Sequence, residues 1–417
     1  MSFFCHGRNE IFDGVSQLGV ADHKVDGRAF VDYLPARIGE HIFRLTVDGK
    51  KTRTVMFVTE AFETLLAKRI DYIVDNQQYH NPKSELDGAY LVYDRKTERI
   101  YYDEVFHDHN AGRERLGMGL LIARYLQTHE NKKFYDSLMQ YVTFVKRQLI
   151  DLESGYVYDG ASKDLRVNRR YNAPWMMQFM AELYRLTKDT AYLDILVKII
   201  RNWYENGGAK FYPNAVDIRL LHDVLKEVDM AELAEVDSLF AEHVDNMLQT
   251  ALDYPPHEVI FEQTIVTPAV TFICEMGEIL HDPQYAEKVR AHIAVLQRFN
   301  GMQPDYRFFG MPIRYWDDYW FGKSGIRGDT LHYWSCLTAN SDYQYYLLSG
   351  SKAHKAAADA CIRNCLSLFL PDGSASCAYM QPYFIDDYAG EYCDDWANDQ
   401  DFALYYALIL HGDAAVG

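Results

Sequence analysis

The sequence lacks long apolar runs and an excess of positive charge. Its apolar stretches fall well short of the roughly 20 residues that a membrane-spanning helix needs. The start of the chain has none of the basic, apolar and small-residue segments of a signal peptide. With a net charge of −18, a surface for nucleic acid or an anionic membrane is not expected. We therefore expect a soluble protein and favour the cytoplasm, and association into homo-oligomers stays open.

The sequence is also poor in cofactor motifs. Its seven cysteines are an odd number and have no metal-ligand spacing. It contains no calcium loop, no glycine-rich phosphate loop and no dinucleotide fingerprint. We expect buried free thiols, no cofactor and no metal.

Short alternating segments are present at the amino-terminal end. Residues 41–47 and 52–58 alternate in polarity around an Asp48-Gly49 turn, which predicts a β-hairpin. Two or three such strands cannot bury a core of their own. Residues 1–59 are therefore either the end of a β-domain or a strand patch docked on a helical body, and the sequence leaves both open.

Helical periodicity dominates from Glu60 onward. The pattern predicts twelve helices that pair into six hairpins, with a long connection inside most pairs and a short one between pairs. The predicted helices are 61–78, 111–129, 134–149, 174–187, 191–206, 216–228, 231–251, 268–280, 284–299, 330–348, 353–369 and 398–410.

The two members of each pair differ in composition. First members such as 68–78 and 284–298 carry charge on one face, as an outer ring exposed to water should. Second members are rich in Gly, Ala, Ser and Thr, as helices crowded into an inner ring need to be. The predicted fold class is mainly α: an (α/α)6 barrel over residues 60–417 with a small β-segment before it.

If the inner helices run in one direction, their amino-terminal ends meet at one end of the barrel. Pro174 and Pro268 are tolerated in a first helical turn, which predicts helix starts near the N-caps Asn172 and Thr267. Polar and aromatic clusters gather at the predicted starts and would then line one pocket. They lie at 106–119, 169–175, 261–268, 327–334 and 394–399.

These clusters suit an acidic sugar. Aromatic residues make up 14% of the chain, and flat faces with polar tips suit a sugar ring. Arginine binds a carboxylate through a planar fork, and helix starts favour anions. Packing between helices and structural salt bridges remain the alternatives for each residue singly. The candidate substrate-binding residues are His109, Asn110, Arg113, Arg115, Tyr171, Asn172, Trp175, Trp316, Arg327, Tyr333 and Trp334.

Carboxylates in the same clusters could hydrolyse a glycoside, which usually needs one acid and one base or nucleophile. Glu262 stands between apolar residues, where partial burial would raise its pKa. Glu114 and Asp329 are the candidate partners, although Glu114 could instead pair with arginine and Asp329 could be an N-cap. His332 completes the candidate catalytic set, and Asp394 and Asp395 are further carboxylates near a helix start.

Two other functions stay open. A polysaccharide lyase needs a neutraliser for the uronate carboxylate and a Tyr or His base. His332 and Tyr333 beside Arg327 could supply these groups, and so could His109-Asn110 near Arg113. The third possibility is a sugar-binding or epimerising protein without hydrolysis.

The chain resembles the six-hairpin glycosidase superfamily of (α/α)6 barrels. More narrowly, Asp108–Gly119 and Gly328–Ser335 are similar to glycoside hydrolase family 154, which implies exo-β-glucuronidase activity. The resemblance covers Glu60 to the carboxyl-terminal end, and the preceding strands match the end of an N-terminal β-domain. Our leading hypothesis is thus an exo-acting hydrolase that removes a terminal β-glucuronic acid or related uronate from an acidic oligosaccharide.

Overall fold

The computed structural model describes most of the chain. The described residues are 9–13, 16–19, 23–25, 28–30, 33–47, 49–102, 116–166, 170–214, 216–255, 263–302, 309–312, 314–316, 328–382, 392–397 and 399–412. No helix within these ranges is both long and apolar enough to cross a membrane.

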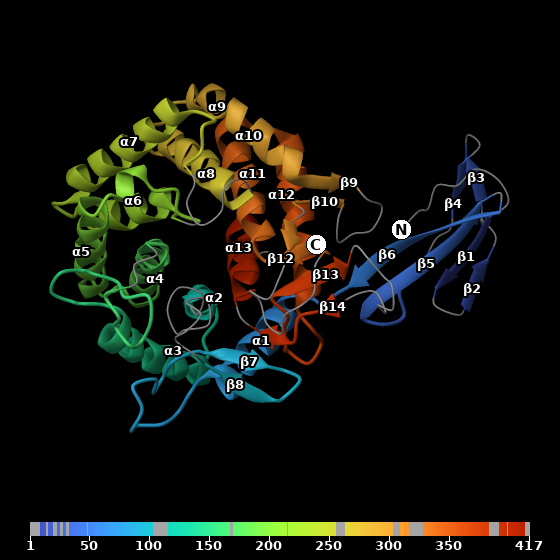
Figure 1. The fold of residues 1–417 in the computed structure, drawn as a ribbon, viewed down its shortest axis with the longest axis horizontal. Coiled ribbons are helices and arrows are strands. Elements are labelled where there is room, and N and C mark those ends of the chain that lie inside the picture. Colours follow the sequence, from blue (N-terminus) through green and yellow to red (C-terminus); the bar gives the residue numbers. More distant parts are fainter. Residues whose placement is uncertain are drawn as a thin grey trace.

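Two concentric rings of helices form the body of the protein (Figure 1). The inner helices are buried on nearly every side, whereas the outer ones bury only one face, as their amphipathic sequences predict. The outer helices are α1 (Phe62–Tyr72), α3 (Lys132–Phe144), α5 (Ala191–Glu205), α7 (Leu233–Thr250), α9 (Tyr285–Lys288) with α10 (Arg290–Leu296), and α12 (Lys352–Cys365). The inner helices are α2 (Leu116–Leu126), α4 (Asn172–Thr187), α6 (Ile218–Glu227), α8 (Gln263–Ile279), α11 (Ser335–Ser349) and α13 (Asp401–His411).

The order of contacts confirms the (α/α)6 barrel. Each inner helix packs on the next around the ring, and α13 closes it by packing on α2. A short turn leads from each inner helix to the following outer one, while long connections lead from outer to inner helices. The inner helices therefore begin at the end of the barrel where the long connections lie. We call this end the mouth.

Two of the predicted helix starts are wrong. Helix α8 begins at Gln263, so Pro268 lies inside it and Thr267 is a buried helical residue rather than an N-cap. A proline inside a helix removes one backbone hydrogen bond, but the close packing of Ile265 and Val266 holds the preceding turn in place. Pro174 does lie in the first turn of α4, as predicted, yet Asn172 is already helical.

The helix predicted to start at Thr330 begins instead at Ser335. Residues Gly328–His332 form a strand, β12, that pairs with β11 (Arg314–Trp316) and β13 (Ala378–Pro382). β14 (Tyr392–Cys393) adds a fourth strand to this sheet. Because β11 and β13 pair with β12 on both sides, its backbone N–H and C=O groups are hydrogen-bonded in a strand, and this pairing outweighs the helical pattern of its sequence. Asp329 is consequently a strand residue and not an N-cap.

The remaining strands are short. β5 (Gly39–Val47) and β6 (Lys50–Val58) form the predicted hairpin, with Gly49 at a φ of +76° in the turn. This hairpin continues into β1 and β2, and the amino-terminal strands stand beside the ring on the side of β9–β14 (Figure 1). The other strands are β1 (Asn9–Asp13), β2 (Ser16–Gly19), β3 (His23–Val25), β4 (Arg28–Phe30), β7 (Val92–Asp94), β8 (Arg99–Tyr101), β9 (Asn300–Met302), β10 (Phe309–Pro312) and β15 (Trp396–Ala397).

A buried ion pair joins the first helix to the last. Arg69 of α1 donates from Nε and Nη2 to the two carboxylate oxygens of Asp401, at 2.6 and 2.8 Å. Neither side chain is exposed to solvent. Asp401 is the first residue of α13, where the helix dipole favours a negative charge. We call this pair the ring clasp.

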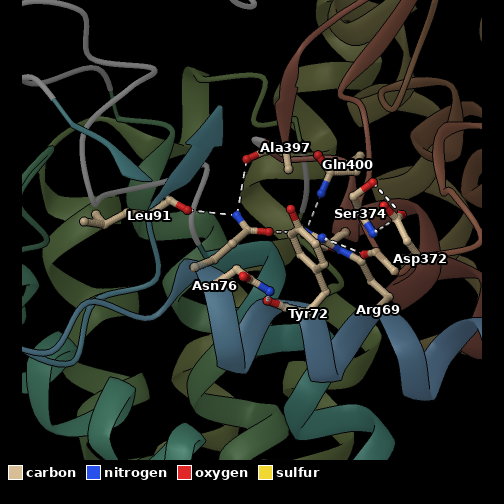
Figure 2. Close-up of polar contacts among 11 residues, drawn as sticks. Arg69, Tyr72, Asn76, Leu91, Asp372, Ser374, Ala397 and Gln400 are labelled. Atoms are coloured by element: carbon tan, nitrogen blue, oxygen red, sulfur yellow. Dashed lines mark hydrogen bonds and ion pairs between the residues drawn. The ribbon is translucent and has the colours of Figure 1, made fainter. Parts of the chain in front are cut away.

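The rest of the clasp is satisfied by hydrogen bonds (Figure 2). Arg69 also donates to the side chain of Gln77 at 2.6 Å and to the carbonyl of Gly373 at 3.2 Å. Gln77 in turn donates to the carbonyls of Leu91 and Ala397. A buried charge pair is tolerated when its remaining donors and acceptors are satisfied, and here the partners come from four separate stretches of the chain.

We expect Arg69→Met to lower the free energy of unfolding by about 3–5 kcal/mol, because it leaves the Asp401 charge buried without a partner. Lys132→Met is the control, since it removes the ion pair of an exposed lysine with Asp136, and it should have little effect. Urea denaturation followed by circular dichroism measures both. Equal midpoints for Arg69→Met and the wild type would contradict a structural role for the clasp.

Candidate functional site

The first turns of four inner helices meet around the ring of Phe402, which is fully buried. Trp175 of α4 lies 4.0 Å from Phe402 between ring centroids, and Tyr333, just before α11, stacks on it at 5.8 Å. Gly117 of α2 has no side chain at this point, and a Cβ there would lie 3.0 Å from the Phe402 ring. Segments more than 280 residues apart are thereby brought together at the mouth.

Helix α8 joins the same assembly through polar contacts. The hydroxyl of Thr338 on α11 donates to Gln263 Oε1 at 2.9 Å. One turn below Phe402, Tyr406 lines a small cavity of about 10 Å³ together with Asn214, Thr271 and Asn340. A cavity of this size holds about one water molecule, so these residues form a polar floor beneath the mouth.

His332 sits at the junction between β12 and α11. It is fully buried and packs edge-on against Tyr333 and Trp334, with ring centroids 4.4 and 5.0 Å away. The backbone N–H of Trp334 donates to His332 Nδ1 at 3.4 Å. A ring that accepts at Nδ1 is the neutral tautomer, which carries its proton on Nε2. His332 is therefore set up as a hydrogen-bond donor through Nε2.

Tyr171 and Asn172 occupy the start of α4. Tyr171 is buried and meets Phe211 edge-on at 4.9 Å. Asn172 donates from Nδ2 to Asp159 Oδ1 at 2.9 Å and to the carbonyl of Tyr158 at 3.2 Å. These bonds tie the connection before α4 to the first turn of the helix.

Polar side chains continue down the inside of the barrel. Gln263, Thr267, Thr271 and Glu275 recur at every fourth position of α8 and are all buried. Burial, with the nearby charge of Asp217, raises the pKa of the Glu275 carboxyl well above its usual range. Sequence reasoning missed this stripe, although its spacing of four was visible and would have marked a polar inner face.

A second buried carboxylate bridges two inner helices deeper in the barrel. Tyr405 of α13 donates to Glu182 Oε1 at 2.9 Å, and Gln127 donates to Glu182 Oε2 at 2.6 Å. The bond from Tyr405 connects α13 to α4, and the one from Gln127 ties the end of α2 to the same carboxylate. Glu182 therefore has a structural role in the inner ring.

Asp394, one of the candidate carboxylates, is almost fully buried. Its Oδ1 accepts the backbone N–H of Trp396 at 3.0 Å, and its Oδ2 accepts the thiol of Cys377 at 3.3 Å. Burial raises the pKa of this carboxyl to about 7. Its contacts fix the turn before β15.

The predicted site residues fall into three groups: some lie at the mouth, some in strands, and some outside the described residues. Tyr171, Asn172, Trp175, His332, Tyr333 and Trp334 lie at the mouth. Trp175 is only 1% exposed and packs on Phe402, and His332, Tyr333 and Tyr171 are as deeply buried, at 0%, 1% and 3%. The backbones of Trp316 and Asp329 lie side by side in β11 and β12, where Trp316 pairs with Gly328 and Asp329 with Tyr315. His109, Asn110, Arg113, Glu114, Arg115, Glu262 and Arg327 lie outside the described residues. Their roles stay predictions.

Comparisons with known proteins give structural matches. Neither a scan against family models nor a search of curated proteins found a match. A solved structure named as a polysaccharide lyase is 33% identical, with a TM-score of 0.93 over 99% of this chain. The chain spans 62% of the length of that protein.

More distant structures share the fold. A sugar epimerase from a ruminal bacterium is 13% identical with a TM-score of 0.53, over 85% of this chain and 98% of that one. A family 76 glycoside hydrolase from a bovine Bacteroides thetaiotaomicron strain is 10% identical with a TM-score of 0.51, over 99% and 94% of the two chains. The chain therefore has the (α/α)6 barrel fold of these six-hairpin structures, as its sequence predicts. These three structures are named as a polysaccharide lyase, a sugar epimerase and a glycoside hydrolase.

The buried carboxyl of Asp394 predicts a pH effect on stability. Between about pH 4, where an unfolded aspartate titrates, and its folded pKa of about 7, the folded state keeps a proton that the unfolded chain releases. Stability contributed by this group is therefore lost as pH rises through that range. The loss is of the order of 3–4 kcal/mol and is complete above the folded pKa.

Asp394→Asn cannot ionise and should flatten this fall in stability with rising pH. Denaturation midpoints measured from pH 4 to pH 8 test the prediction. Asp136→Asn, at an exposed position, should keep the wild-type slope. An unchanged slope in Asp394→Asn would show that this carboxyl is not protonated in the folded protein.

Proposed function

We propose that this chain cleaves uronate-containing polysaccharides by β-elimination, as a polysaccharide lyase. The observation that supports this most strongly is the likeness to the polysaccharide lyase structure, at 33% identity and a TM-score of 0.93. The epimerase and the hydrolase are similar in fold alone, at identities of 13% and 10%. Elimination was the alternative to hydrolysis in the sequence, and it now has the stronger support.

Elimination at a uronate proceeds without water. A base takes the proton from C5, the electron pair forms the C4–C5 double bond, and the bond from C4 to the glycosidic oxygen breaks. That oxygen then takes a proton from an acid. The carboxylate next to C5 must be neutralised by hydrogen bonds or positive charge, because negative charge builds up on it as the proton leaves.

We propose that His332 donates a hydrogen bond to the uronate carboxylate. Its Nδ1 accepts from the Trp334 backbone, so that Nε2–H is a donor in a buried, low-dielectric position where a hydrogen bond to an anion is strong. Asn110, Arg113 and Arg327 are proposed to complete the carboxylate site. A neutral histidine of this tautomer is not a base at Nε2, which leaves a tyrosine phenol for proton abstraction.

We propose two of the described tyrosines as candidates for that role. Tyr171 is the N-cap residue just before α4, and Tyr333 follows His332 directly and stacks on Phe402. Both belong to the mouth. A tyrosine in its phenolate form can take the proton from C5, and the phenol so formed can give that proton to the leaving oxygen. We propose that one of these two phenols is the base and the acid.

The described carboxylates fit hydrolysis less well. Asp401 forms an ion pair with Arg69, and Asp394 accepts a hydrogen bond from the backbone N–H of Trp396. Glu182 accepts hydrogen bonds from Tyr405 and Gln127. Each of these has a structural use. The carboxylates that the sequence put forward for hydrolysis are Glu114, Glu262 and Asp329, whose side chains lie outside the described part of the chain. Exo-β-glucuronidase activity and the likeness to family 154 stay predictions, as does an epimerising function.

We expect the purified protein to produce unsaturated uronides from at least one uronate-containing polysaccharide. The new C4–C5 double bond absorbs in the ultraviolet, and each cleavage creates one reducing end, so both signals should rise together. Hydrolysis raises reducing ends alone, and 4-nitrophenyl β-glucuronide tests for it separately. Release of nitrophenol with no ultraviolet product on any uronate glycan would reverse the assignment.

Single substitutions should identify the base. Either Tyr171→Phe or Tyr333→Phe should lower kcat by about 10²–10⁴-fold, the usual contribution of general acid–base catalysis, while the other leaves it within about tenfold. His332→Ala should also lower kcat, by about 10²–10³-fold as for one lost oxyanion donor. Initial rates on the preferred glycan measure all three. Full activity in both tyrosine variants would rule out the assignment of the base.

A further inference from the structure

One buried amide at the mouth has an unused hydrogen-bond donor. Gln263 is the first residue of α8, and it is only 1% exposed. Its Nε2 atom has no hydrogen-bond partner among the described residues. Buried polar side-chain atoms are hydrogen-bonded in the large majority of cases, and each exception calls for an explanation. The groups assigned above to elimination do not include Gln263.

The hydroxyl of Thr338 fixes the orientation of this amide. Thr338 lies on α11, is fully buried, and donates to Gln263 Oε1 at 2.9 Å. Because the oxygen of the amide faces Thr338, the nitrogen lies on the other side and keeps both of its hydrogens for donation. The unused part of the amide is thus a pair of N–H donors, and it suits a ligand atom that accepts hydrogen bonds.

The position of Gln263 in its helix brings these donors to the mouth. Side chains of a helix lean toward its amino-terminal end, and Gln263 is the residue at which α8 begins. Its partner Thr338 is the fourth residue of α11, and α11 begins three residues after His332. Gln263 and His332 therefore lie at the same end of the barrel, and both are positioned by the start of α11.

A second buried glutamine, Gln344, shows the contrast. Its Nε2 donates to Asn340 Oδ1 at 3.3 Å, and its Oε1 has no partner in the part of the chain that the structure describes. Gln344 is the tenth residue of α11, which places it about 13 Å along that helix from its start. Its unused atom is an acceptor deep in the ring, whereas that of Gln263 is a donor at the mouth.

An unused buried donor lowers the stability of the folded chain. Leaving a buried N–H group without an acceptor costs free energy that an apolar side chain of the same shape avoids. Methionine has nearly the length and volume of glutamine and would fill the position of Gln263 without this cost. An acceptor that arrives with a ligand would offset the cost, and the mouth is where the proposed function places its ligand.

We propose that Gln263 Nε2 donates a hydrogen bond to the carboxylate of the uronate, in addition to the hydrogen bond from His332. An ionised carboxylate only accepts hydrogen bonds, and a bond to it is roughly twice as strong as one between neutral groups. Negative charge grows on this carboxylate as C5 loses its proton, so the bond strengthens in the transition state. The inference rests on the proposed function and adds one catalytic residue to it.

Gln263→Met removes the donor and keeps the length of the side chain. We expect kcat on the preferred glycan to fall about 10–100-fold, as for one lost hydrogen bond to a charged group, while the thermal midpoint stays at or above the wild-type value. Thr338→Val frees the amide to rotate and should lower kcat less. Gln344→Met is the matched control and should keep the wild-type kcat. Initial rates and thermal unfolding measure these effects.

Binding of monosaccharides tests the contact with the carboxylate directly, because elimination cannot cleave them. Calorimetry gives the Kd of D-glucuronate and D-galacturonate, and of D-glucose and D-galactose, which carry a hydroxymethyl group in place of the carboxylate. Gln263→Met should weaken binding of the uronates about tenfold and leave binding of the neutral sugars unchanged. Gln344→Met should leave all four unchanged. Thr338→Val carries the test should Gln263→Met fail to fold.

The outcomes separate this inference from elimination itself. If no unsaturated product forms but Gln263→Met still weakens uronate binding alone, elimination is wrong and the contact with the carboxylate stands. Equal weakening for uronates and neutral sugars would give Gln263 a role in packing and overturn the inference. Wild-type kcat and wild-type uronate binding in Gln263→Met would overturn it as well. Should the wild type bind none of the four sugars, kcat decides, and a protein with neither activity nor uronate binding would also overturn it.

Discussion

The contact between the first and last helices is the constraint on which the rest of this barrel depends. Arg69 and Asp401 are 332 positions apart and are both fully buried. Because desolvating two charges is costly, the pair is stable only when α1 and α13 meet in the register that also satisfies Gln77 and Gly373. That register fixes α13, and α13 carries Phe402, Tyr405 and Tyr406 into the centre of the ring. The position of the ring clasp thus decides where the floor of the mouth lies.

The barrel interior along α8 is close-packed yet unusually polar. The side chains of Gln263, Thr267 and Glu275 line one face of α8, and each has at least one polar atom without a hydrogen-bond partner among the described residues. An unsatisfied buried polar group costs about 1–3 kcal/mol, so a barrel selected for stability alone would carry apolar residues here. The polar face is consistent with an interior that meets water or sugar hydroxyls. The clasp and the tight aromatic packing around Phe402 offset its cost.

The sequence predicted most of the helices because each one repeats its own apolar pattern over three or more turns. It failed where a distant partner decided the outcome. β12 became a strand because β11 and β13 pair with it, and Pro268 was absorbed into α8 by packing against neighbouring helices. For the same reason the sequence could not reveal Arg69 and Asp401 as a pair or Phe402 as the meeting point of four helices. Tyr171, His332 and Tyr333 were predicted as site residues because polar and aromatic side chains cluster next to predicted helix starts, which is a local signal.

The same barrel is found in structures named as a lyase, a hydrolase and an epimerase. The ring brings the starts of the inner helices together, and the side chains at those starts decide the chemistry. In this chain Asp401 is engaged by an arginine, Asp394 by a turn and Glu182 by a tyrosine. His332 is oriented by a backbone N–H at a strand-to-helix junction, a contact that no substitution of the Trp334 side chain removes. The proposed role of His332 as a donor through Nε2 therefore depends on a backbone contact. A site that presents a fixed neutral donor beside phenols is suited to stabilising a carboxylate while a proton leaves its neighbouring carbon.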